Sequence, residues 1–349
     1  MRNLLPILLA AICALLNPSC EHRPLSDPNN AHYIRIYLDE QIKNVTCDFY
    51  DPALEHPEYT RPKVMRVAVF DPATDKLVAE RFLQNQGSDE RGHYFDGYIG
   101  IPAGEYNLIT YSFGSAVTMV RNEDSFYQME AYTNPISDHY LQYIPSSRND
   151  IDQSNILNAP EHLFHSVEQP ILIDDSPELD TLLTAEGDYF TAHSMVKSYY
   201  LQVKVQGFEW IRTAVSMLGG MAESSLLHGH DKIESANPAQ VFFAMKYANK
   251  ERTRDNSTSA TLYATFNTFG KLPDVPSIYT LNLEFVRSDG TSQVEQIDIT
   301  PMFDTPMVRD NRWIIIDREI VITPPEGGAS GGMSPGVESW ENVEGGIQI

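Results

Sequence analysis

The chain has 349 residues, of which 42% are hydrophobic, and a formal net charge of −23. Acidic residues are dispersed along its length, so the composition excludes an intrinsically disordered chain and predicts a globular protein. The strong negative charge argues against binding of nucleic acid and against electrostatic docking on an anionic lipid surface. The length exceeds what one hydrophobic core usually supports, so two domains are expected.

The first twenty residues have the layout of a secretory signal. Arg2 precedes an apolar run from Leu4 to Leu16, and Cys20 follows shortly afterwards. The run is shorter than the roughly 20 apolar residues that span a bilayer. A cysteine at this place resembles the lipobox of bacterial lipoproteins, although Asn17 stands where a leucine is usual. We expect residues 1–19 to be removed and Cys20 to be acylated; the alternative is an ordinary cleaved signal with an incidental cysteine.

Cysteine usage limits what else can stabilise the chain. Cys13 lies within the signal, and Cys47 has no partner in the chain if Cys20 carries lipid. Neither a disulfide framework nor a cysteine metal site is then available, so the fold must depend on apolar cores. Residues 20–30 are polar and contain two prolines, which is typical of a spacer between a membrane and a first domain.

Residues 31–185 are expected to form a first all-β domain. Apolar and polar residues alternate from Tyr33 to Leu38, which predicts a half-buried strand. A hairpin is expected where Pro102-Ala103-Gly104-Glu105 joins two strands, with Gly104 taking a positive φ. Residues 121–165 predict a long ordered connection, and residues 176–185 a short helix or loop at the boundary. The further strands predicted here are Val64–Phe70, Lys76–Phe82, Tyr94–Ile101, Tyr106–Phe113 and Ile171–Ile173.

Residues 186–325 are expected to form a second antiparallel β-sandwich. Their most regular strand begins at Tyr199, and Asp289-Gly290 marks a tight hairpin turn. The Gly-rich segment 326–349 is either a loose tail or docks back on the sandwich through Val337, Trp340 and residues 347–349. The remaining strands predicted here are Trp210–Leu218, Gln240–Tyr247, Ala260–Phe269, Ser277–Arg287, Ser292–Ile299 and Trp313–Ile322.

Several of these features together resemble one family of envelope proteins. They are the amino-terminal cysteine, Val64–Phe70 followed by Asp-Pro-x-Thr, the turn from Ile101 to Tyr106, the strand from Tyr199 to Trp210, and the Gly-rich ending with Val337-x-x-Trp340-Glu341. In this order they are similar to the fimbrillin-related lipoproteins of the Bacteroidales. That group includes fimbrial anchor subunits and a neighbouring Bacteroides family of unknown function.

The resemblance implies two tandem transthyretin-like β-sandwiches held on the outer membrane through Cys20. It implies a role in seating a pilus or in surface adhesion, with fimbrial subunits or other envelope proteins as partners. It also implies polymerisation of stalk subunits by strand donation, for which an exposed sheet edge is suited. Glu21-His22-Arg23 lacks the acidic run that often follows the cysteine of surface-displayed lipoproteins. The resemblance therefore does not say which face of the outer membrane the protein occupies.

A binding module of another class is the alternative. Exposed aromatic side chains could stack against sugar rings, and Tyr132, Tyr140 and Trp340 are the candidate glycan contacts. The competing interpretation is that such rings cover the sandwich, because large aromatic surfaces are usually buried.

Catalytic and metal-binding patterns are weak. Glu161, His162 and His165 are closely spaced, and His228-Gly229-His230-Asp231 resembles a chelating segment, but no third ligand is indicated by the spacing. Adjacent acidic pairs occur at Glu123-Asp124 and Asp174-Asp175. Gly-x-Ser-x-Gly occurs only in the Gly-rich ending, which offers no strand-to-helix turn for a nucleophile. The sequence therefore predicts a protein without catalytic residues, cofactor or metal.

Overall fold

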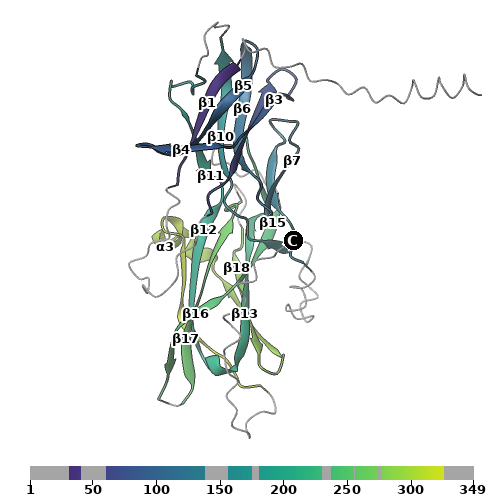
Figure 1. Ribbon diagram of the computed structural model, residues 1–349. Helices are drawn as coiled ribbons and strands as arrows, with labels where there is room; N and C mark the ends of the chain where they lie inside the picture. The colour runs from purple at the N-terminus through teal and green to yellow at the C-terminus, as the bar shows by residue number, and fades with distance from the viewer. Residues whose placement is uncertain are drawn as a thin grey trace, which may run out of the picture.

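The computed structural model describes residues 31–40, 60–137, 156–174, 181–229, 237–254, 256–272 and 277–325. In these ranges the chain is almost entirely β-strand, and its helical segments are single turns: η3 (Phe208–Trp210), η4 (Thr300–Asp304) and α3 (Pro306–Arg309). The expected all-β class is confirmed. The sheets lie in two stacked parts, with β1 to β6 in one and β12 to β20 in the other (Figure 1).

An eight-stranded sheet makes up most of the first part, in the order β3-β2-β6-β10-β11-β1-β5-β4. It curls so that apolar side chains from its two halves meet, among them Ile36 of β1 and Val67 of β2. The bounds of its strands are β1 (Ala31–Leu38), β2 (Val64–Asp71), β3 (Lys76–Leu83), β4 (Asn85–Asp89), β5 (Gly92–Gly100), β6 (Gly104–Phe113), β10 (Phe164–Ile173) and β11 (Phe190–Ser194).

Two sheets packed face to face make up the second part. The orders are β16-β17-β12-β20 and β19-β18-β13-β15-β9. Their facing side chains form the largest core, to which Leu201, Phe266 and Phe285 contribute. The expectation of a wholly antiparallel sandwich is wrong, because β12 pairs with β20, and β15 with β9, in parallel. The bounds are β12 (Lys197–Gln206), β13 (Ile211–Ala222), β15 (Pro238–Ala244), β16 (Lys246–Arg252), β17 (Thr258–Thr268), β18 (Thr280–Arg287), β19 (Ser292–Asp298) and β20 (Trp313–Val321). Every strand predicted in residues 186–325 has a counterpart in the structure. The turn at Asp289-Gly290 joins β18 to β19, with Gly290 at φ 85°.

The two parts exchange short strands. β14 (Ser224–Leu226) pairs with β8 (Glu130–Thr133), which also pairs with β7 (Thr118–Arg121). In the other direction, β9 (Ile156–Asn158) adds to β15 as a parallel edge strand. A further apolar core lies beneath the small sheet and takes Phe126 and Tyr111 from one part and Leu227 and Phe269 from the other. Residues 121–165 thus contain strands as well as an irregular connection.

The division expected at residue 185 stays a prediction. β11 begins at Phe190 and belongs to the eight-stranded sheet, where it pairs with β1 and β10. Residues 176–180 of the short helix or loop expected at 176–185 lie outside the described residues, and residues 181–185 contain no helix. The Gly-rich ending lies outside the described residues.

The hairpin expected between Tyr94 and Phe113 is wrong. β5 pairs with β1 and β4, whereas β6 pairs with β2 and β10, so the segment around Pro102 joins opposite halves of the curled sheet. Gly104 does not have a positive φ. Ile101 is fully buried, and its carbonyl accepts a hydrogen bond from Nε2 of buried His32 at 3.1 Å. Burial of the apolar residues on both sides of the turn therefore outweighs local hairpin pairing.

Candidate functional site

The outer face of β1 and β5 carries a continuous set of tyrosine and charged side chains. Ile34 and Ile36 of β1 point into the core, so Tyr33, Arg35 and Tyr37 point outward. The antiparallel register places each of them opposite an outward residue of β5, in the pairs Tyr33 with Tyr98, Arg35 with Asp96, and Tyr37 with Tyr94. We call Tyr33, Arg35, Tyr37, Tyr94, Tyr98 and Tyr189 the tyrosine–arginine surface.

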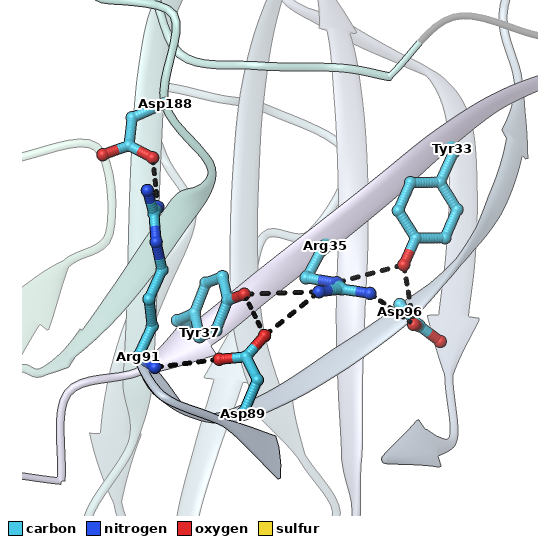
Figure 2. A network of polar contacts seen from close by, with 7 residues as sticks. All are labelled: Tyr33, Arg35, Tyr37, Asp89, Arg91, Asp96 and Asp188. Carbon is cyan, nitrogen blue, oxygen red and sulfur yellow. Dashed lines mark hydrogen bonds and ion pairs between the residues drawn. The ribbon is translucent and has the colours of Figure 1, made fainter. Parts of the chain in front are cut away.

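Arg35 is the centre of this surface (Figure 2). Its Nε donates to Tyr33 Oη at 3.1 Å, and its Nη1 donates to Tyr37 Oη at 3.3 Å and to Asp89 Oδ2 at 3.2 Å. Its Nη2 lies 3.6 Å from Asp96 Oδ2. Because the planar guanidinium uses its fork of donors in several directions at once, it fixes both neighbouring tyrosines.

The tyrosine rings are held by aromatic contacts as well. The Arg35 guanidinium carbon lies 4.0 Å from the centre of the Tyr94 ring, a cation–π distance. Tyr37 makes edge contacts with Tyr94 and Tyr189, whose ring centres are 5.5 and 5.7 Å away. Gly87 of β4 lies opposite Tyr94, and a Cβ there would collide with the Tyr94 ring. The small residue on β4 therefore lets this ring lie flat along the sheet.

Carboxylates complete the network. Tyr33 donates to Asp96 Oδ2 and Tyr37 to Asp89 Oδ2, both at 2.7 Å. The backbone N–H of Arg91 donates to Asp89 Oδ1 at 2.9 Å, and the Arg91 side chain forms an ion pair with Asp188 (Figure 2). Contacts from three strands and from the segment before β11 thus meet on one face.

The electrostatics favour fixed charges rather than proton transfer. Burial raises the pKa of Tyr33 to about 12, and the hydrogen bond to Asp96 adds to the rise. Burial also raises the pKa of Tyr37, while the hydrogen bond from Tyr37 lowers the pKa of the Asp89 carboxyl. At neutral pH the hydroxyls therefore stay protonated and Asp89 stays ionised. This arrangement suits recognition, since Tyr and Arg are the residues that dominate protein contact surfaces.

Of the three residues predicted as glycan contacts, Tyr132 alone lies among the described residues. Tyr132 lies on β8, is half-buried, and has the Arg121 guanidinium 4.9 Å from its ring centre. Tyr140, Trp340 and the predicted lipid site Cys20 lie outside the described residues.

The segments around His162 and His228 are described in part, and their described side chains have structural contacts. In the described part of the chain, no group of three or more His, Cys, Asp or Glu side chains surrounds a common point. His228 packs against the rings of Phe126 and Tyr127, and His162 donates or accepts a hydrogen bond with Ser194 Oγ at 2.8 Å. Residues 230 and 231 and the Gly-x-Ser-x-Gly repeats lie outside the described residues.

The acidic pair Glu123-Asp124 has structural contacts, and Asp175 of the other pair lies outside the described residues. Glu123 forms an ion pair with buried Arg66, and Asp124 lies 3.6 Å from Lys76 Nζ. From the sequence alone, Tyr33, Arg35 and Tyr37 are only the polar face of a half-buried strand. The available signal was the recurrence of Tyr four residues apart in both β1 and β5, since residues an even number of positions apart in a strand share a face.

Comparison with known proteins places this fold in a family. The family model described as "Domain of unknown function (DUF5119)" matches residues 54–244, more than half of the chain. The chain belongs to the DUF5119 family. Among the described residues of this DUF5119 protein, no helix is both long enough and apolar enough to cross a membrane.

Individual proteins and solved structures similar to this chain are named as fimbrial or adhesive proteins. The chain is 22% identical over 314 residues to the Bacteroides ovatus (strain ATCC 8483) protein named "Putative fimbrium anchoring subunit Fim4B", covering 81% of this chain and 84% of that one. A crystal structure of a "putative adhesin" from the same species has a TM-score of 0.57 at 19% identity, covering 89% of this chain and 99% of that one. The fimbrial anchor protein Mfa2 of Porphyromonas gingivalis aligns with a TM-score of 0.39 at 10% identity, covering 78% and 83% of the two chains. The resemblance to fimbrial anchor subunits and to a neighbouring family of unknown function is confirmed.

Replacing Arg35 by lysine tests whether the tyrosine–arginine surface depends on the guanidinium. Lysine keeps the charge, but one ammonium cannot bond Tyr33, Tyr37 and both carboxylates together. We expect the free energy of unfolding in urea to fall by about 1–3 kcal/mol. Arg318→Lys is the control, because Arg318 is 56% exposed and pairs with Glu295 at 3.3 Å; its effect should stay within about 0.5 kcal/mol. Equal effects of the two substitutions would contradict the central role of Arg35.

His162 should make the fold sensitive to acid. Burial, with a smaller contribution from Arg312, lowers the pKa of His162 from 6.5 to about 4. The unfolded chain therefore binds a proton that the folded chain does not between pH 6.5 and 4, and stability falls as the pH falls through this window. The loss is up to about 3 kcal/mol and is complete below the folded pKa. Urea unfolding at pH 7 and at about pH 4 should show a smaller difference in His162→Gln than in the unmodified protein. The same difference in both would show that His162 is not its source.

Proposed function

We propose that this protein is a lipid-anchored, non-enzymatic subunit of the cell envelope that acts in fimbrial anchoring or surface adhesion. The observation that carries the proposal is the match to a fimbrium anchoring subunit over 81% of the chain. Cys20 is the proposed lipid attachment site, and the outer membrane is the proposed location. Acyl chains on Cys20 would attach the protein to the membrane, since each buried CH₂ contributes about 0.8 kcal/mol to the free energy of membrane binding.

The architecture supports a protein that works through contacts. We infer that the curled eight-stranded sheet and the second sandwich correspond to the tandem transthyretin-like sandwiches of fimbrial subunits. The exchange of β9 and β14 between the two parts fixes one to the other, which suits a subunit that bears mechanical load. Fimbrial subunits or other envelope proteins are the proposed partners.

The tyrosine–arginine surface is the proposed contact area for such a partner. Tyr98 is 52% exposed, and its ring centre lies 5.5 Å from that of Tyr33. It stands beside the network in which the hydroxyls of Tyr33 and Tyr37 already donate to carboxylates. Rigid aromatic side chains lose little conformational entropy on binding, which makes them effective anchors. β4 ends the sheet next to this surface, so its outer edge could pair with a strand of a partner. No observation favours the glycan-binding alternative, because the one described candidate, Tyr132, has its ring beside Arg121.

Cys20→Ala tests the anchor. Without an acylated cysteine the protein has no lipid, so we expect it to move from the membrane fraction to the soluble fraction of the envelope. In a deletion strain of the native organism, the unmodified gene should retain fimbriae on the cells, whereas the Cys20→Ala gene should release them into the medium. Cys47→Ala is the matched control and should behave like the unmodified protein. Persistence of the Cys20 variant in membranes would contradict the proposed tether.

Tyr98→Ala tests the contact area. We expect fewer fimbrial subunits, identified by mass spectrometry, to be recovered by cross-linking on intact cells. Loss of an aromatic anchor of this kind commonly costs about 2 kcal/mol or more of binding free energy. Tyr127→Ala is the control, because Tyr127 is 43% exposed but lies away from the tyrosine–arginine surface. Equal recovery with both variants would show that the partner binds elsewhere.

A further inference from the structure

β1 is the first strand of the described chain, and it lies inside the eight-stranded sheet between β5 and β11. Every residue from Ala31 to Tyr37 has an antiparallel partner on β5, and residues 36–38 have parallel partners on β11. A backbone hydrogen bond from the Leu182 N–H to the Tyr33 carbonyl, at 2.8 Å, continues this second side. Both edges of β1 are therefore paired.

Side-chain contacts tie β1 to its neighbours on both sides as well. The contacts of Arg35 extend across the sheet from β1 to β5 and β4 (Figure 2). Just past the end of β1, Asp39 Oδ2 lies 2.9 Å from Nδ1 of His193 on β11. The next residue is Glu40, whose Oε2 lies 2.7 Å from Nδ1 of His93 on β5. The middle and the end of β1 are thus connected to the strands that flank it.

The position of β1 along its neighbours is fixed by its two faces. Ile34 and Ile36 are fully buried in the core, whereas Tyr33, Arg35 and Tyr37 point outward. A slip by one residue would turn every side chain of β1 to the opposite face, and a slip by two would move each of them by about 7 Å. Either displacement breaks the contacts of both faces together, so β1 resists sliding along its own axis.

We propose that β1 is a force-bearing strand, which carries tension from the membrane tether to the tyrosine–arginine surface and is held to β4 and β5 by Arg35. The inference rests on the proposed function, in which Cys20 carries the lipid. Residues 21–30 connect Cys20 to the start of β1, so a pull on the lipid acts on Ala31 and draws β1 towards its start. A partner bound over Tyr98 would pull β5 in the opposite direction.

Force in this direction acts on the contacts of β1 all at once. β1 and β5 are antiparallel, and tension along their common axis slides one strand past the other instead of opening the ladder from one end. The backbone hydrogen bonds lie perpendicular to the strands, so they are stretched together, and the contacts of Arg35 are stretched with them. The strand that carries Tyr33, Arg35 and Tyr37 keeps its place under tension, and the contact area stays intact.

Pulling single molecules in two directions tests the proposal without lipid or partner. The chain from Cys20 onward, made without lipid and with Cys47→Ala, has one free thiol for a DNA handle. The second handle is attached to Glu90→Cys, in the exposed turn before β5, or to Ala103→Cys, in the exposed segment after β5. Because Ala31 lies opposite the end of β5, the first pair of handles slides β1 along β5, and the second pair peels β1 away from its start.

The rupture force should be higher with the handle at Glu90 than with the handle at Ala103. Both positions are exposed and lie outside the strands, so β1 and its contacts are unmodified in the comparison. Equal rupture forces in the two directions, or a higher force in the peeling direction, would overturn the proposal.

Arg35→Lys tests the contribution of the guanidinium to this resistance. Forced unfolding is governed by the unfolding rate. We expect the lifetime at a fixed force, applied through Cys20 and Glu90→Cys, to fall about tenfold, which corresponds to about 1.4 kcal/mol of barrier. Arg318→Lys is the matched control and should leave the lifetime unchanged, because Arg318 lies on β20 in the other part of the molecule. The same lifetime in both variants would overturn the role of Arg35 in the force-bearing strand.

The outcomes separate this inference from the proposed function. Release of Cys20→Ala from membranes tests the tether, whereas the pulling experiment uses a chain without lipid. If β1 peels and slides with equal ease, the force-bearing strand is wrong and fimbrial anchoring is untouched. If the Cys20 variant stays in membranes, the tether is wrong, although the pulling experiment still measures the resistance of β1.

Discussion

β2 and the greater part of β6 form a layer that is buried on both of its faces, and the positions of the other features follow from this constraint. Met65 and Val67 of β2 face one core, while Ala68 and Phe70 face another that is shared with the second part of the molecule. A strand that is covered on both faces needs apolar residues at nearly every position, and β2 has such a sequence. Because both parts contribute to the second of these cores, neither buries its apolar surface without the other.

The opposite half of the curled sheet is covered on one face only. Ile34 and Ile36 of β1 point into the core and are fully buried, whereas Tyr33 and Tyr98 on the outer face are partly exposed. An exposed sheet face is stable when its polar side chains satisfy one another. Arg35 achieves this by linking tyrosines to carboxylates across the strands, and a rigid surface rich in tyrosine results. The same rigidity lowers the entropy lost when a partner binds.

The seam between β10 and β11 lies where these two kinds of layer meet. β10 follows the doubly covered half and β11 follows the singly covered half, so their pairing is short and a cavity opens beside it. His165 and His193 are brought face to face only because both strands remain paired at this point.

The sequence by itself determined the all-β class, many of the longer strands and the resemblance to fimbrial anchor subunits. Alternation of apolar and polar residues reports which face each side chain takes, and that is a local property, so β1 and β12 could be located closely. Which strands pair was decided only by the tertiary structure. The segment around Pro102 has hairpin chemistry but joins opposite halves of the sheet, because burial of Ile101 among distant strands outweighs local pairing. For the same reason the tyrosine–arginine surface and the histidine pair, which is separated by 28 residues, could not be assembled from spacing: strand register is fixed by contacts between residues far apart in the chain.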